Sequence, residues 1–427
     1  MKIWRGDEFV RAVPRKRLFD LDAFEDDVRM IIRDVRNRGD EALIEYAARF
    51  DGLNLRLGEI QVSAEEISQA YRAVDEDFVR SLKVAMENIQ RYYEQQLSRS
   101  WMTVTREGTV LGKIYIPVEK VGIYVPGGAA RYPSSVLMTA LPAKVAGVKE
   151  TVMCTPAASS GKVDPHVLVA ADLAGVKRVF RVGGAQAIAA MAFGTESIPP
   201  VDMIVGPGNV YVTVAKKLVY GQVGIDMLAG PSEIAVLCDY TANPVIVAAD
   251  LLSQAEHDVY ASAILVTASE RLAETVQEEL AARLDKVSRR DIVARSLENR
   301  GAIVLVENME EGIEVINHYA PEHLELLVEK PFELLGQIKN VGTIFVGPYS
   351  AEALGDYTAG PSHVLPTGGT AKYASGLGIE TFLKVSNVVA VSREGFLALK
   401  DATKKLAEVE GLDAHKASIE TREGVLC

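Results

Sequence analysis

A long alternation of short apolar runs and helical segments is the feature of this chain that most constrains its fold. From Val121 to Val219 the runs are punctuated by glycine and separated by helical segments of about ten residues. This spacing is typical of βαβ units, in which parallel strands are joined by crossover helices. The four predicted strands are Val121–Val125, Thr151–Cys154, Val179–Val182 and Met203–Val205.

A second alternation of the same kind begins near Glu233. Its predicted strands are Ile234–Leu237, Ala263–Thr267, Ala302–Val306, Leu324–Val328 and Thr343–Val346. Its predicted helices include Ala242–His257, Glu270–Leu284 and Met309–Asn317. The sequence therefore predicts two α/β halves of similar length, although no clear repeat links their residues.

The two ends of the chain differ from this centre. Apolar residues at three-to-four spacing from Phe24 to Val35 predict a helix that Gly39 can end. Ser63 and Glu66 form a plausible capping box, a third helix is expected over 76–96, and 109–117 is expected to be a strand or part of a hairpin. The residues after Leu377 are expected to form a strand and a helical tail that is too short for a core of its own.

Composition narrows the class of protein. The chain has 427 residues, which favours two or three domains, and its net charge of −12 argues against a nucleic-acid or anionic-membrane surface. Its three cysteines are too few for a disulfide framework and favour a reducing cytoplasm. The N-terminal residues lack the apolar core of a signal peptide, and no apolar run is long enough to predict a membrane span.

Three glycine-containing turns end a predicted strand and open a predicted helix. They are 124–128, 183–186 and 206–209. Strand ends of this kind place backbone N–H groups and helix N-termini where they can bind an anion, so together they could hold a dinucleotide. Each turn alone is better explained by the need for a tight βα connection, and none has the G-x-G-x-x-G pattern of the standard fingerprint.

Two pairs of residues have chemistry suited to a metal or to proton transfer. Gln254 and His257 are three apart on a predicted helix, so both side chains can face one zinc ion, although a solvated helix end explains them as well. Glu322 and His323 precede a predicted strand and combine the two side chains that act most often as general bases. Without other evidence, this pair is simply a surface turn after a proline.

Other polar residues are weaker candidates when taken alone. Asp356 falls in a glycine-rich loop and His415 near the chain end, where such residues are usually solvated; His363, seven residues after Asp356, could support it. Cys154 and Cys238 lie in apolar strands with no positive neighbour, so we expect core thiols rather than nucleophiles.

Taken together, these segments resemble the histidinol dehydrogenase family from one end of the chain to the other. The segments that carry the resemblance, in order, are VGIYVPGGAARYPSSVLMTALPAKVAGV, RVGGAQAIAAMAFGT, GPGNVYVTVAKKLVYG, IDMLAGPSEIAVLCD, DLLSQAEHD, NHYAPEHLEL, GDYTAGPSHVLPTGG and EGLDAHKASIETR. The family's enzymes use zinc, one ion per subunit, and oxidise L-histidinol through the aldehyde to L-histidine with two NAD⁺, the last step of histidine biosynthesis.

The resemblance implies a role for each matching residue. The implied metal ligands are Gln254, His257, Asp356 and His415. The implied catalytic pair is Glu322 and His323, and the implied nucleotide contacts are Tyr124, Gln186 and Asn209. Ser232 and Glu410 match substrate contacts, together with the metal ligands and His323.

The resemblance also implies an α/β fold with two Rossmann-like parallel-sheet domains of an incomplete dinucleotide-binding type, in a cytoplasmic homodimer. We expect a helical region over 1–120 that packs on the second α/β half, α/β domains over 121–233 and 234–377, and a tail over 378–427 that packs on the partner subunit. Two other functions remain open. One is the NAD-dependent oxidation of another small amino alcohol or diol, and the other is a metal- or nucleotide-binding regulatory protein.

Overall fold

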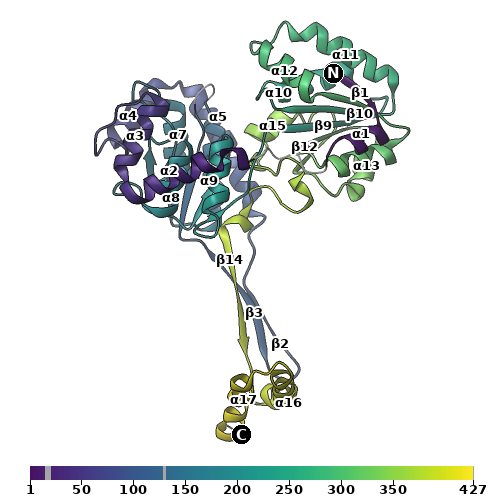
Figure 1. The fold of residues 1–427 in the computed structure, drawn as a ribbon. Coiled ribbons are helices and arrows are strands. Elements are labelled where there is room, and N and C mark those ends of the chain that lie inside the picture. The colour runs from purple at the N-terminus through teal and green to yellow at the C-terminus, as the bar shows by residue number, and fades with distance from the viewer. Residues whose placement is uncertain (15–20, 128–130, 427) are drawn as a thin grey trace. The chain divides into compact units, whose positions relative to one another are not determined.

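The computed structural model describes residues 1–14, 21–127 and 131–426, and it divides the chain into two compact units (Figure 1). The main unit comprises Met1–Gln96 and Val118–Phe382, and the tail unit comprises Leu97–Pro117 and Leu383–Cys427. Gly128, the last residue of the first glycine-rich turn, and Cys427 lie outside the described residues. In the described part of the chain no helix is long and apolar enough to cross a membrane.

A five-stranded parallel sheet forms the first α/β half of the main unit. Its strand order is β6-β5-β4-β7-β8. The strands are β4 (Lys120–Tyr124), β5 (Glu150–Cys154), β6 (Arg178–Phe180), β7 (Met203–Val205) and β8 (Gly224–Ile225). They alternate with α6 (Pro133–Ala146), α7 (Pro165–Ala174), α8 (Gly184–Phe193) and α9 (Val210–Val219). The predicted βαβ alternation is confirmed here, and glycines with positive φ, Gly147 and Gly175, end α6 and α7.

A six-stranded parallel sheet forms the second half, with the order β1-β11-β10-β9-β12-β13. Its strands are β1 (Lys2–Arg5), β9 (Glu233–Cys238), β10 (Ser262–Thr267), β11 (Ala302–Leu305), β12 (His323–Leu327) and β13 (Thr343–Val346). Its helices are α1 (Gly6–Ala12), α10 (Pro244–Ala255), α11 (Glu270–Leu284), α12 (Arg290–Arg300), α13 (Met309–Tyr319), α14 (Pro331–Leu334) and α15 (Glu352–Tyr357). Short 3-10 turns occur at Asp22–Phe24, Leu335–Gln337, Thr370–Lys372 and Ile379–Phe382.

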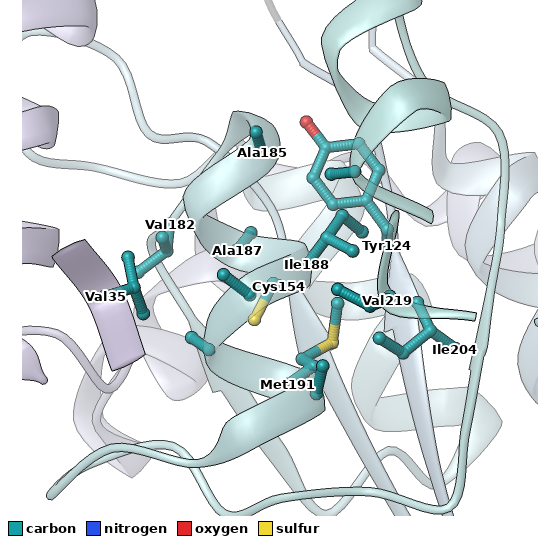
Figure 2. Close-up of a cluster of buried hydrophobic side chains, with 14 of the residues drawn as sticks. Val35, Tyr124, Cys154, Val182, Ala185, Ala187, Ile188, Met191, Ile204 and Val219 are labelled. Atoms are coloured by element: carbon teal, nitrogen blue, oxygen red, sulfur yellow. The ribbon is translucent and has the colours of Figure 1, made fainter. Parts of the chain in front are cut away.

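Four N-terminal helices pack on the five-stranded half rather than on the second half, where we expected them. They are α2 (Glu25–Arg38), α3 (Asp40–Asp51), α4 (Ala64–Ala73) and α5 (Glu76–Glu94). Val28 and Val35 of α2 are fully buried in one cluster with Ile188 of α8, and Figure 2 shows Val35 facing Val182 and Ala187. Burial of each such side chain contributes about 1.5–3 kcal/mol. Only β1 and α1 join the six-stranded half, where β1 pairs with β11.

The tail unit contains an antiparallel sheet and two helices. Strand β3 (Val110–Pro117) pairs with β2 (Trp101–Val104) in a hairpin and with β14 (Leu383–Ala390) along eight residues. Helices α16 (Arg393–Val409) and α17 (Asp413–Leu426) follow. The expected tail over 378–427 therefore gains a second segment, 97–117, because β14 needs a partner strand to satisfy its backbone groups.

Candidate active site

The predicted catalytic pair lies at the amino edge of the six-stranded sheet. His323 is the first residue of β12 and Glu322 precedes it, beside the start of β9, where Glu233 N donates to Glu322 Oε2 at 2.9 Å. Both side chains are almost completely buried, with His323 only 3% exposed. The sequence predicted this pair just before a strand, and the structure has it there.

Four polar side chains surround the His323 imidazole. Its Nδ1 lies 3.2 Å from Gln254 Oε1, 3.8 Å from Glu352 Oε1 and 3.9 Å from Glu322 Oε2, and its Nε2 lies 4.0 Å from Asp356 Oδ1. Burial lowers the pKa of His323 to about 4, against the opposing effect of Asp356. A ring with this pKa is neutral at pH 7 and can accept a proton.

His257, just beyond α10, and two acids of α15 form a group that could hold a cation. The ligand atoms of His257, Glu352 and Asp356 all lie within 4.8 Å of one another. Gln254 is in the last turn of α10 and His257 lies just beyond that helix, while Glu352 and Asp356 are four residues apart on α15. Nitrogen and oxygen donors in this number suit zinc.

Unpaired buried atoms test whether a cation fits. Gln254 is fully buried and its Nε2 has no hydrogen-bond partner among the described residues, and neither has Glu352 Oε1. If the amide of Gln254 is turned over, Nε2 faces His323 and Oε1 becomes the unpaired atom. A cation in contact with Gln254 Oε1 and Glu352 Oε1 would remove the cost of leaving both acceptors buried and unpaired.

The acids of this cluster have raised pKa values. Burial raises the pKa of Glu352 to about 9, with the charge of Asp356 adding to the effect. Burial also raises the pKa of Glu322 well above its usual range, although the Glu233 N–H opposes the rise. Buried carboxyl groups whose neighbouring acids raise their pKa values further favour a bound cation at this position.

His363 connects this cluster to α6. Its Nδ1 lies 3.0 Å from the backbone oxygen of Asp356, and its Nε2 lies 3.0 Å from Ser135 Oγ. The sequence suggested a supporting position for His363 next to Asp356, and the structure places it there. Ser135, a residue of α6, had no signal in the sequence beyond its position in a helix.

The predicted nucleotide contacts lie at the carboxyl edge of the five-stranded sheet. Tyr124 is the last residue of β4, and its hydroxyl accepts a hydrogen bond of 3.0 Å from Gly184 N at the start of α8. Gln186 is in the first turn of α8, and Asn209 caps α9 by accepting from Val212 N at 3.2 Å. These groups stand at two helix N-termini, where an anion is favoured.

Three other residues, Ser232, Glu410 and His415, were implied as substrate or metal contacts. Ser232 immediately precedes β9, next to the Glu233 N–H that binds Glu322. Glu410 is the C-cap of α16 and His415 is in α17, so both belong to the tail unit. Their roles remain predictions.

One expectation was wrong, one residue was missed, and one expectation was confirmed. Asp356 was expected in a loop, but it lies in α15, a short helix that contains Gly355 and is followed by the C-cap Thr358. Glu352 was missed, although its spacing of four from Asp356 was a signal. Cys154 and Cys238 are free and fully buried, and burial raises the pKa of both thiols, so the prediction of core cysteines is confirmed.

Comparison with known proteins gives one consistent family. The family model described as histidinol dehydrogenase matches residues 15–423. The histidinol dehydrogenase of Carboxydothermus hydrogenoformans is 51% identical over 98% of both chains, and that of Caldanaerobacter subterraneus is 53% identical over 92% of this chain and 91% of its own. The crystal structure of histidinol dehydrogenase from Elizabethkingia anophelis superposes with a TM-score of 0.95 at 36% identity, over 100% of this chain and 98% of that one.

Proposed function

The chain belongs to the histidinol dehydrogenase family of oxidoreductases, and we propose that it oxidises L-histidinol through L-histidinaldehyde to L-histidine, with one zinc ion per subunit and two NAD⁺ per substrate. One alcohol, two NAD⁺ and one water then give one carboxylate, two NADH and three protons. The observation that carries the proposal is the juxtaposition of a neutral, buried His323 with Glu322 and the cluster His257, Glu352 and Asp356. In this proposal the protein catalyses the last step of histidine biosynthesis, in the cytoplasm.

Gln254, His257 and Asp356 would hold the zinc ion, with His415 as the fourth ligand. A bound zinc ion would supply a site for the imidazole and amine of histidinol, which fixes the orientation of the hydroxymethyl group. The support is the unpaired amide of Gln254 and the convergence of His257 and Asp356. Glu352, which also faces this cluster, would either replace a ligand or hold one in position.

Tyr124, Gln186 and Asn209 would bind the nucleotide. Bound NAD⁺ would supply the hydride acceptor for both oxidation steps. The support is the position of these residues at the N-termini of α8 and α9, where backbone N–H groups suit the pyrophosphate. No G-x-G-x-x-G motif is required, because the strand ends at Tyr124 and Gly206 already bring the backbone to this edge.

His323 and Glu322 would divide the proton chemistry. His323 would accept the alcohol proton as hydride leaves the carbon, since its imidazole is neutral at pH 7. Glu322 would then take a proton from the water that attacks the aldehyde, in the ionised form that a zinc ion held by the neighbouring residues would favour. The resulting hydrate loses the second hydride and becomes the acid.

Water rather than a thiol would attack the aldehyde. Cys154 and Cys238 are fully buried, and burial raises the pKa of both thiols, so neither is available as a thiolate. This agrees with a water-activating role for Glu322.

The cationic groups of histidinol favour it over other amino alcohols. Glu410 would pair with the ammonium or imidazole of the substrate, and Ser232 would contact it from the start of β9. The alternative, another small amino alcohol or diol, lacks the cationic imidazole that Glu410 and His415 would suit.

A substrate panel tests this choice. Purified protein loaded with zinc is mixed with NAD⁺ and with L-histidinol or related amino alcohols and diols, and NADH is followed by absorbance. We expect two NADH for each histidinol consumed and no comparable turnover of the other alcohols. NADH formation from a simple diol at the same rate would contradict the proposal.

The tail unit would make the protein a homodimer. It exposes large apolar side chains on both its sheet and its helices, and these would be covered in a dimer. Examples are Met102 at 60%, Val389 at 66%, Leu406 at 64% and Val409 at 74% exposed.

Mixed dimers test whether the tail completes the partner's site. We expect chains with His415→Ala and chains with His257→Ala, each inactive alone, to regain activity when co-expressed, because one of the two sites would then be intact. If the mixed protein stays dimeric and inactive, each site is built within one chain.

A further inference from the structure

A buried ion pair beside the nucleotide edge has no part in the mechanism above. Lys216 of α9 and Asp226, one residue beyond β8, form a direct salt bridge, and their side chains are 3% and 0% exposed. Such a pair loses hydration on folding, and an apolar pair of similar volume is often as stable or more so. A role beyond stability therefore needs a specific contact, and the structure supplies one.

The pair holds both backbone groups of Gly206. Lys216 Nζ donates to Gly206 O at 3.0 Å, and Gly206 N donates to Asp226 Oδ2 at 2.7 Å. The second carboxylate oxygen of Asp226 accepts from Met227 N at 2.6 Å. Gly206 has φ +113°, and a Cβ added there would lie 2.1 Å from the backbone oxygen of Tyr124. The pair thus fixes a strained glycine tightly against β4.

This glycine lies at the centre of the proposed nucleotide site. Asn209 follows it by three residues, so the position of Gly206 sets the start of α9. Tyr124, against which Gly206 packs, accepts the hydrogen bond from Gly184 N, two residues before Gln186. The three proposed nucleotide contacts are therefore joined through Gly206 and Tyr124.

We propose that Lys216 and Asp226 are positioning residues for the nucleotide: they hold the 206–209 turn at the geometry that binds NAD⁺. The inference rests on the proposed function, because it takes Tyr124, Gln186 and Asn209 as the nucleotide contacts. Among the described residues of the main unit, the pair bonds to Gly206 and Met227, so we expect its effect at the nucleotide edge.

A neutral double variant tests this role without leaving an unpaired charge. Lys216→Met with Asp226→Asn keeps one acceptor oxygen, which can serve Gly206 N or Met227 N but not both, and it removes the ion pair and the bond to Gly206 O. The matched control is Arg178→Met with Glu150→Gln, which removes an ion pair between β5 and β6 at the amino edge of the same sheet. NAD⁺ binding to the zinc-loaded protein is measured by calorimetry without histidinol, together with zinc content, the KM for histidinol and thermal stability.

We expect the Kd for NAD⁺ to rise about tenfold or more in the Lys216/Asp226 variant, since a small displacement of a binding group has effects of this size. The control should bind NAD⁺ within about twofold of the parent, and zinc content and the KM for histidinol should be unchanged in both. A Kd within about twofold of the parent in the folded double variant would overturn the inference.

Two further results keep the test decisive. If the double variant does not fold, Asp226→Asn alone, which keeps the shape of the side chain and one of its two acceptor oxygens, should still raise the Kd for NAD⁺ severalfold, and an unchanged Kd would again reject the role. If the parent protein binds no NAD⁺ at all, the proposed function fails instead.

Discussion

The two α/β halves of the main unit share an architecture but use opposite edges of their sheets. The five-stranded half presents Tyr124, Gln186 and Asn209 at the carboxyl edge, at the N-termini of α8 and α9. The six-stranded half presents Glu322 and His323 at the amino edge, where α10 and α15 end. A helix N-terminus carries a partial positive charge and a C-terminus a partial negative one. The edge used therefore matches the charge of the proposed ligand: an anionic nucleotide in one half and a metal cation in the other.

Acidic side chains of the two halves also differ in the direction of their pKa shifts. In the five-stranded half Glu66 is paired with Arg181, and hydrogen bonds hold its pKa below the usual value although burial opposes them. In the six-stranded half burial raises the pKa of Glu352 to about 9 and of Glu325 to about 9. Glu66 has its counter-charge within the protein, whereas Glu325 and Glu352 would be neutralised by a bound cation or by protonation.

Loss of the metal is the largest effect that this comparison predicts. His257→Ala should remove zinc and abolish turnover, while NAD⁺ still binds, because the nucleotide residues belong to the other half. The control is His166→Ala, a histidine at the start of α7 that is held by Asp164. Metal analysis and calorimetry measure the two ligands separately. Zinc at full stoichiometry in the His257 variant would break the assignment.

Substitution of a glycine at the nucleotide edge should have a smaller effect, and it should change NAD⁺ binding rather than zinc binding. Gly206→Ala forces a Cβ to within 2.1 Å of Tyr124 O, whereas Gly221, which also has positive φ, has open space around it. Both substitutions strain the backbone by about 1–2 kcal/mol, but only the first displaces the nucleotide edge. We expect the Kd for NAD⁺ to rise at least about tenfold in Gly206→Ala and to stay unchanged in Gly221→Ala, with zinc content normal in both. Equal losses of NAD⁺ affinity in the two variants would show that strain alone is responsible.

The smallest effect concerns the pH dependence of stability. A carboxyl group with a lowered pKa in the folded state stabilises the protein above its unfolded pKa, and that contribution disappears as the pH falls through the folded pKa. Glu66→Gln should therefore lower the free energy of unfolding at pH 7 by at most about 1 kcal/mol, because Glu66 is partly exposed. The difference should shrink below pH 4.5, the usual value for this group. Denaturant unfolding at pH 7 and pH 3.5 measures it, and a difference that grows in acid would reverse the sign.

Much of the fold could be predicted from the sequence because periodicity is a local property. Helix α11 and strand β13 have the predicted bounds, and the Ser63–Glu66 capping box is present, with Glu66 N donating to Ser63 Oγ at 3.2 Å. The apolar stripe of α2 predicted its buried face but could not show which sheet that face would meet. Strand β1 gave no signal, since it is a short edge strand with a lysine and an arginine at its ends.

The sequence predicted the residues of the candidate site better than it predicted their arrangement in space. Gln254, His257, Glu322 and His323 drew attention through residue type and spacing, and the structure brings them into one cluster, in which Gln254, Glu322 and His323 are buried. Because this segment is rich in glycine, the sequence did not predict α15, and Glu352 was not recognised as a candidate. The position of Glu322 and His323 before a strand was predicted, but local spacing could not show their distance from Gln254 and Asp356, because that depends on where α10 and α15 end relative to β12.

The division of labour within the six-stranded half is tested most directly by single-turnover NADH formation, once from histidinol and once from supplied histidinaldehyde. Glu322→Gln keeps the shape of the side chain but removes its basicity, so it should slow aldehyde oxidation by roughly 10²–10⁴-fold and alcohol oxidation much less, because only the aldehyde step consumes water. His323→Asn should slow alcohol oxidation strongly. If Glu322→Gln slows both steps equally, or only the alcohol step, Glu322 is not the base that activates water.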